Sequence, residues 1–261
     1  MKALFYAALA VYVLAVVLQF AGAAFRKEKL LRISGYVFLA GFVVHTIFLV
    51  ARGVSARRLP MSNQFEFANA FAWGVALMLI VIKKRMKAEW LSVAGMPAAL
   101  LIMSYAALQP MEIHDLMPAL RSAWFGVHIG CAVISYSSFV LAGVSSLRYL
   151  MSQKKGSEAR LLDQMDYLSY RMIAFGFLFL TVVILSGAIW AEQAWSAFWT
   201  WDPKEVWALI TWIIYAVYLH LRLRRQRRGA FAAWYAVISV PVVFFTFAGV
   251  NTLMHGLHTY G

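Results

Sequence analysis

Residues 172–190 read M-I-A-F-G-F-L-F-L-T-V-V-I-L-S-G-A-I-W and contain no charged side chain. A helix needs roughly 20 apolar residues to cross the hydrocarbon core of a bilayer, so this stretch is long and apolar enough to span one. The rest of the chain has a similar character, because 63% of its 261 residues are hydrophobic and only 13% are charged. This composition excludes a water-soluble domain and predicts an integral membrane protein.

Further apolar runs on both sides of this stretch predict an all-α, polytopic bundle of about eight transmembrane helices. They use nearly the whole chain, so we expect a single integral-membrane domain over residues 1–261 and no separate soluble domain. The first span is too long for a cleaved signal peptide and is expected to be retained. The polar stretch 148–171 is expected to form a surface helix. The predicted spans are 3–25, 33–51, 67–82, 90–108, 123–147, 172–190, 207–221 and 231–248.

The positions of the basic residues indicate the membrane topology. The chain has 24 lysines and arginines and a net charge of +13, and most of these residues lie after the first, third, fifth and seventh spans. By the positive-inside rule these four connections face the cytoplasm. Both termini and the connections near 52–66, 109–122 and 191–206 are then outside. The basic cluster from Arg52 to Arg58 departs from the rule, since it lies in a connection predicted to be outside.

Cys131 is the single cysteine and lies inside the fifth predicted span. One thiol cannot form an intramolecular disulfide, and the chain has no C-x-x-C motif, so it does not itself perform dithiol exchange. Packing within the helix bundle is the expected role of this residue.

The connection between the sixth and seventh spans is unusually aromatic. Residues 190–207 read W-A-E-Q-A-W-S-A-F-W-T-W-D-P-K-E-V-W. An interfacial aromatic belt accounts for one or two rings at a helix end, whereas a loop that is itself aromatic suits a flat, π-rich ligand. Phe198, Trp199 and Trp201 are candidates for an apolar platform. Lys204 and the start of the next helix offer positive potential to a carboxylate.

The same segment carries the signals of a helix start. Asp202 is the expected N-cap, Pro203 the first helical residue and Glu205 the acid of a capping box. The aromatic loop is therefore expected to be fixed rigidly to the start of the seventh span.

Histidines flank this loop. His128 lies about one turn inside the outer end of the fifth span, and His255 and His258 lie in the tail after the eighth. Imidazole is the commonest axial ligand of haem iron, and one on each side of a porphyrin would hold it at the outer surface. A single histidine of this kind is more often a hydrogen-bonded packing residue. Their convergence on one side of the membrane favours haem.

Two more histidines lie within spans. His220 follows Trp207 by 13 residues, which places it about 20 Å further along the helix, toward the cytoplasmic end. His45 lies in the second span, nearer the outer half. Ionisable residues inside a bilayer are costly and are candidates for function. Either the two histidines hold a second haem together, or another subunit supplies the ligand opposite His220.

At these residues the sequence resembles the CcsA, or ResC, family of cytochrome c biogenesis (System II) proteins, in the haem-handling superfamily named for its WWD motif. The resemblance covers most of the chain from about residue 45. Ser196 and Thr259 stand where the family usually has glycine and serine. The matching blocks are L-P-M-S-N-Q-F-E-F (59–67), W-F-G-V-H-I (124–129), W-S-A-F-W-T-W-D-P-K-E (195–205), W-A-L-I-T-W-I-I-Y-A-V-Y-L-H (207–220) and G-V-N-T-L-M-H-G-L-H-T-Y (249–260).

The resemblance implies a set of haem-contacting residues. His128 and His258 take the places of the external axial ligands of a bis-histidine haem b, and His220 that of a transmembrane ligand, for which His45 is a candidate partner. His255 is an extra candidate, although the L-H-T-Y context favours His258. The loop at about 190–207 takes the place of the haem-presenting WWD loop, with Trp195, Trp199, Trp201, Asp202, Lys204 and Glu205 as its haem-binding residues.

The resemblance also implies a function. Haem from the cytoplasmic side of the inner membrane would be held by His220, moved outward and presented to the thiols of C-x-x-C-H in an apocytochrome c, which form thioether bonds. A separate CcsB/ResB-type membrane partner is expected, and thiol-reducing biogenesis proteins act indirectly. The chain would act by orienting haem, so no catalytic residue and no nucleic-acid partner are expected. Whether it is an enzyme depends on whether its complex is counted.

Three other functions stay open. A related protein would load a haem chaperone, but the D-P-K-E and L-H-T-Y sequences argue against it. A cytochrome b-type electron-transfer subunit normally needs four histidines paired within helices, whereas most histidines here lie near the outer edge. A transporter without haem would require a broken helix or a polar site at the membrane midplane, and the sequence offers no convincing one.

Overall fold

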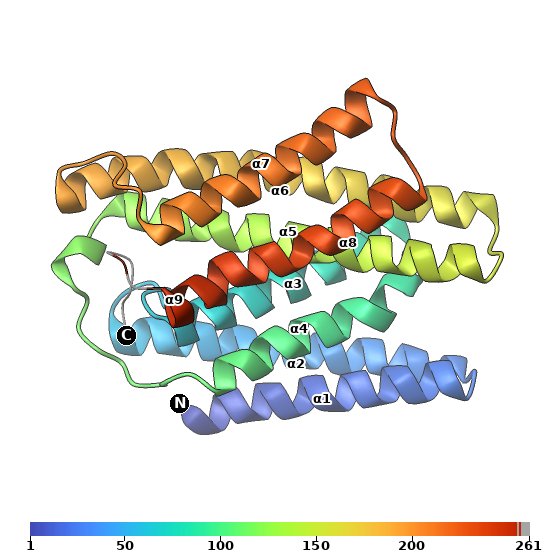
Figure 1. The fold of residues 1–261 in the computed structure, drawn as a ribbon. Coiled ribbons are helices and arrows are strands. Elements are labelled where there is room, and N and C mark those ends of the chain that lie inside the picture. Colours follow the sequence, from blue (N-terminus) through green and yellow to red (C-terminus); the bar gives the residue numbers. More distant parts are fainter. Residues whose placement is uncertain (255, 257–261) are drawn as a thin grey trace. The chain divides into compact units, whose positions relative to one another are not determined.

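The computed structural model describes residues 1–254 and 256, and this part of the chain is all-α (Figure 1). Its eight long helical segments are each long and apolar enough to cross a membrane, which confirms the predicted number of spans for a multi-pass membrane protein. The elements are α1 (Lys2–Ala24), α2 (Glu28–Ala56), α3 (Gln64–Met86), η1 (Glu89–Leu91), α4 (Ser92–Ala107), η2 (Pro118–Leu120), α5 (Ala123–Lys154), α6 (Ala159–Trp195), α7 (Pro203–Arg224), α8 (Ala230–Phe244), η3 (Phe245–Gly249) and α9 (Val250–Leu253).

Internal contacts divide the chain into two compact units. The first, Met1–Asp115, contains α1 to α4, in which α1 packs on α2 and α4, and α3 packs on α4. The second begins at Leu116, and in it α5 packs on α6 and α8 while α7 packs on α6 and α8. The expectation of one functional domain over residues 1–261 stays a prediction.

Small residues bring α5 and α6 close together. A Cβ on Gly176 of α6 would lie 2.8 Å from the Phe139 ring and 3.0 Å from the Ser135 carbonyl oxygen, both on α5. The Ser135 hydroxyl donates a hydrogen bond to the Gly176 carbonyl at 2.8 Å. Lipid is as apolar as the helix surfaces, so close packing and such hydrogen bonds, and not a hydrophobic driving force, hold spanning helices together.

The polar stretch 148–171 differs from its prediction. α5 continues to Lys154 and α6 begins at Ala159, so nearly all of these residues extend the two long helices. The prediction of a separate surface helix was wrong. A helix satisfies its own peptide groups and need not stop where the apolar sequence stops, and Asp166 in this extension forms an ion pair with Arg222 of α7.

The last span changes from an α-helix to a π-helix near its C-terminal end. α8 leads into the π-helical segment η3, which is followed by the short helix α9. The Thr246 and Thr211 hydroxyls lie 2.9 Å apart and join this segment to α7. Single π turns in helices are rare and are frequent at functional sites, because they rotate the residues that follow.

We predict that Gly176→Ala destabilises the second unit. The added methyl group collides with the Phe139 ring, and overpacking of this kind costs about 1–3 kcal/mol. The measurement is loss of helical circular dichroism when detergent-solubilised protein is titrated with sodium dodecyl sulfate. Gly130→Ala is the control, because a Cβ there meets no described atom within 4 Å and alanine favours helix by about 1 kcal/mol. Equal stability of the two variants would contradict this packing.

Candidate functional site

The tryptophan-rich segment forms the end of α6, a short loop and the start of α7. α6 ends at Trp195, and Ser196 follows in the left-handed region with φ 56° and ψ 33°. Its N–H donates to the Glu192 carbonyl at 2.8 Å. This conformation costs a residue with a side chain about 1–2 kcal/mol and suits glycine. The helix end therefore gives a physical reason for glycine at the position of Ser196.

Two carboxylates fold the loop onto the start of α7. Asp202 Oδ1 accepts from the Lys204 N–H at 2.9 Å. Glu205 Oε2 accepts from the N–H groups of Thr200 at 2.8 Å and Asp202 at 3.2 Å. With Pro203 as the first helical residue, the predicted N-cap, first-turn proline and capping box are confirmed. The loop is thus joined to the helix by several hydrogen bonds.

The loop presents large aromatic side chains outward. Phe198 is 63% exposed and Trp201 is 72% exposed. Trp201 has a left-handed backbone with φ 59°, a region that bulky residues rarely occupy and that is common at functional sites. Trp199 packs edge-to-face against it at 5.8 Å. A patch of exposed aromatic rings on a rigid loop indicates a surface for an apolar, flat ligand.

His128 on α5 packs against α6 between Val183 and Trp190. Its Nδ1 is 2.8 Å from the Val183 carbonyl oxygen, which can only accept, so Nδ1 carries the proton. In the neutral form of this imidazole, the lone pair is on Nε2. Its ring centroid lies 5.8 Å from that of Trp190. A histidine whose one nitrogen is held by a carbonyl has the tautomer and orientation typical of a metal ligand.

Gly187 makes room for this imidazole. A Cβ at Gly187 would lie 2.8 Å from His128 Nδ1 and 2.9 Å from its Cε1. Sequence reasoning missed this residue, because one glycine in an apolar span gives no functional signal. Its place one turn before Trp190 was the only available hint.

The tryptophans of the segment have different roles. Trp190 is 1% exposed, and its Nε1 donates to the Ala119 carbonyl at 2.7 Å. Its ring packs against Trp195 at 5.0 Å and Phe125 at 5.3 Å. Trp207 packs against Phe245 at 4.3 Å. Trp190 and Trp207 are therefore packing residues, and the exposed surface comes from the middle of the segment.

The described part of the tail ends at the start of α7. A Cβ on Gly256 would collide with the Asp202 carboxylate and lie 3.0 Å from Pro203 Cδ. Lys204 and Asn251 help to line a small cleft at this point. His255 and His258 lie outside the described residues, so their assignment as ligands stays a prediction. Their neighbour Gly256 is nevertheless next to the N-cap of α7.

The two histidines of the spans have opposite surroundings. His220 lies on an exposed face of α7 in the second unit. His45 is fully buried in the first unit, with its Nδ1 3.4 Å from the Tyr12 hydroxyl and its ring packed beside Phe48. Their pairing around a second haem stays a prediction.

This chain is similar to a protein family, to relatives and to a solved structure whose descriptions all name cytochrome c. Residues 61–258 match the family described as Cytochrome C assembly protein. The chain is 34% identical to the cytochrome c biogenesis protein CcsA of Guillardia theta, over 92% of this chain and 89% of the relative. It is 35% identical to CcsA of Parasynechococcus marenigrum (strain WH8102), over 82% and 81%. Among solved structures, Cytochrome c Heme Lyase CcmF shares its fold, with a TM-score of 0.74 at 15% identity over 99% of this chain and 47% of that protein.

We predict that Ser196→Gly stabilises the protein by about 1 kcal/mol, because glycine adopts the left-handed conformation without steric cost. Ala194→Gly, within the last turn of α6, should have the opposite effect by about 1 kcal/mol. Thermal unfolding of the two purified variants, followed by tryptophan fluorescence, measures both shifts. A Ser196→Gly variant that unfolds at a lower temperature than wild type would be inconsistent with this backbone assignment.

Proposed function

This chain belongs to the cytochrome c assembly protein family, and we propose that it holds haem and presents it for covalent attachment to an apocytochrome c. The observation that carries the proposal is His128, whose Nδ1 is held by the Val183 carbonyl of α6, the helix that leads into a loop with exposed aromatic rings. Haem is the cargo of this process. The relatives in the comparison are described as cytochrome c biogenesis proteins.

Residues of α5, of the loop and of the start of α7 fit haem in three respects. His128, with its lone pair on Nε2, supplies an axial ligand. Phe198 and Trp201 offer exposed rings to the porphyrin face. Lys204, at the positive end of α7, offers a cation to a propionate group. The other proposed contacts are Trp195, Trp199, Asp202 and Glu205, of which the two acids also hold the loop in place.

We assign His258 as the second external ligand. It follows Gly256 by two residues, and Gly256 lies against Asp202 at the base of the loop. Two imidazoles would fill both axial positions of the iron, so the bound haem b would be six-coordinate. The loop side is assigned to the outside of the cytoplasmic (inner) membrane, because the connections on the other side carry most basic residues.

In the attachment reaction, the role of this chain is to orient haem toward the thiols of the apocytochrome. Each thiol of the reduced C-x-x-C-H motif adds across a haem vinyl group, so that sulfur bonds to one vinyl carbon and hydrogen to the other. No oxidant or reductant is consumed in this addition. The histidine of the motif then replaces one external ligand. The chain acts by holding the reactants together, as a subunit of a synthase complex.

For His220 we propose a ligand role completed by a second chain. His220 shares the exposed face of α7 with Ile213 and Val217, while Tyr215 and Tyr218 face inward. An imidazole on a lipid-facing surface is costly unless another group covers it. A CcsB/ResB-type membrane partner with a histidine opposite His220 would cover it. His45 would first have to leave its packing beside Tyr12, so we favour the partner.

The first test is spectroscopic. The chain, copurified with its membrane partner, should show a b-type haem signal in its reduced-minus-oxidised spectrum. His128→Ala and His258→Ala each remove an axial ligand and should lower this signal, and added imidazole should restore it by filling the vacant position. His220→Ala removes the proposed ligand within the membrane and should also lower this haem signal. If haem is absent from every preparation while the variants still mature c-type cytochromes, the haem proposal fails.

A second prediction concerns Gly187. Gly187→Ala places a methyl group against His128 Nδ1, so the imidazole has to leave the Val183 carbonyl. Haem bound per protein should fall several-fold, and imidazole should restore it as it does for His128→Ala. Gly130→Ala on α5 is the matched control, since its Cβ meets no described atom within 4 Å. Wild-type haem content in Gly187→Ala would argue against His128 as a ligand.

A further inference from the structure

An ion pair joins α6 to α7 at the ends of these helices that are predicted to be cytoplasmic. Arg222 donates from Nη1 to Asp166 Oδ1 at 2.7 Å, and its Nη2 donates to Asp166 Oδ2. The two side chains are only 7% and 14% exposed, and the guanidinium lies 5.3 Å from the Tyr170 ring centroid. A guanidinium that pairs through two parallel N–H groups is held in direction as well as in distance. The pair therefore restricts how α7 can be turned on α6.

The same carboxylate holds the turn that follows α7. Asp166 Oδ1 also accepts from the Gly229 N–H at 3.2 Å. Gly229 is the N-cap of α8, and its φ of 71° favours glycine. A Cβ there would lie 3.1 Å from the Tyr149 hydroxyl of α5. Asp166 thus fixes the end of α7 and the start of α8 through contacts that all lie within the second unit.

α7 has a buried face and an exposed face, and His220 lies on the exposed one. Contacts with other helices of the same unit hold the buried face at three levels, namely Thr211 on Thr246, Tyr215 on Phe139 and Arg222 on Asp166. Of these three residues of α7, Arg222 is the nearest to His220. It follows His220 by two residues, which is about 200° around the helix. The pair with Asp166 therefore lies on the side of α7 opposite the imidazole.

The surroundings of a membrane helix make such a contact important for its rotation. Besides His220, the exposed face of α7 carries the apolar residues Ile213 and Val217. Lipid and a neighbouring helix are equally apolar, so burial of apolar surface does not select one rotation of the helix. Polar side chains select it, since each loses its partner when the helix turns. In the last turn of α7, Arg222 has this role.

We propose that Asp166 is a positioning residue for the transmembrane haem ligand His220. Asp166 holds Arg222 against α6, and this contact keeps the imidazole on the exposed side of α7, where the membrane partner can reach it. The inference rests on the proposed function, in which His220 binds haem. Without the carboxylate, Arg222 is a buried guanidinium with no anion, which is strongly unfavourable. Because Asp166 lies just before the apolar run 172–190, the arginine can then turn toward water, and the last turns of α7 turn with it.

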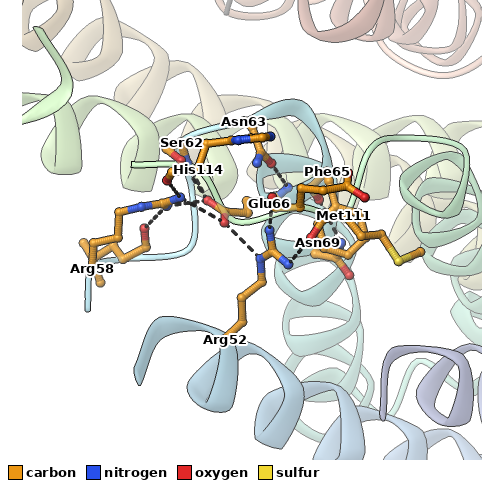
Figure 2. A network of polar contacts seen from close by, with 11 residues as sticks. Arg52, Arg58, Ser62, Asn63, Phe65, Glu66, Asn69, Met111 and His114 are labelled. Carbon is orange, nitrogen blue, oxygen red and sulfur yellow. Dashed lines mark hydrogen bonds and ion pairs between the residues drawn. The ribbon is translucent and has the colours of Figure 1, made fainter. Parts of the chain in front are cut away.

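A second buried carboxylate serves as a comparison (Figure 2). Glu66, in the first turn of α3, is 0% exposed and accepts from Arg52 Nε at 2.9 Å and from Arg58 Nη1 at 2.6 Å. Arg52 also donates from Nη1 to the Met111 carbonyl at 2.8 Å. All of these residues belong to the first unit, whereas His220 belongs to the second. Glu66→Gln therefore removes a buried carboxylate that is paired with arginine and leaves the contact between α6 and α7 unchanged.

The experiment measures haem per protein in the chain copurified with its membrane partner, with and without added imidazole. Asp166→Asn keeps the shape of the side chain and removes its charge. Its controls are Asp163→Asn, at an exposed position of the same helix, and Glu66→Gln. Arg222→Lys keeps the charge but cannot pair through two parallel N–H groups. Arg224→Lys, at an exposed position of the same turn, is the control for that variant.

We expect Asp166→Asn to lose haem several-fold and to regain it with imidazole, which fills the iron position that a misplaced His220 leaves vacant. Arg222→Lys should behave in the same way to a smaller extent. The two exposed controls should bind haem as wild type does, and any haem that Glu66→Gln loses should not return with imidazole. In a His220→Ala background with imidazole present, Asp166→Asn should cause no further loss, because Asp166 acts through that histidine.

Three results would overturn this inference and leave the proposed function intact. The first is a wild-type haem content in Asp166→Asn. The second is a loss that imidazole does not restore, and the third is a further loss in the His220→Ala background, because Asp166 would then support the unit without acting through His220. If Asp166→Asn does not accumulate, Arg222→Lys is judged by the same criteria. A wild-type complex without haem contradicts the proposed function itself, and this inference falls with it.

Discussion

A bilayer offers no hydrogen-bond partner to a peptide group, so every residue that crosses it has to satisfy its own backbone. The chain meets this constraint with eight helical spans in its described residues. Polar chemistry is then concentrated where helices begin and end. Two regions of the described chain follow this pattern: the loop between α6 and α7 carries exposed aromatic rings, and the first turn of α3 carries the buried carboxylate Glu66.

Backbone carbonyls serve repeatedly as acceptors for side chains. His128 is oriented by the Val183 carbonyl, Trp190 by that of Ala119, and Arg52 by that of Met111. A carbonyl is available at every residue, so such contacts depend on the path of the chain and tolerate changes in the residue that accepts. The donors carry the specificity, since each must have the right length and N–H direction to reach its acceptor.

Charged side chains near the ends of the spans also have specific partners. Glu66 accepts from two arginines in the first unit, and Asp166 pairs with Arg222 in the second. A buried ion pair contributes little net stability, but removing one partner is costly. These pairs therefore act mainly to fix geometry. Because Glu66 pairs with Arg52 and Arg58, the count of basic residues in the connection near 52–66 overstates its net positive charge.

The sequence by itself determined the eight spans, the cap formed by Asp202 and Glu205, and the histidines worth considering. These features depend on composition and on contacts within a turn of helix. The space that Gly187 leaves for His128, the reach of Arg52 to Met111 and the continuation of α5 and α6 through 148–171 required the tertiary structure. Such features depend on how each helix is rotated about its axis. Apolar sequence does not specify that rotation, because side chains that face lipid and side chains that face a neighbouring helix are equally apolar.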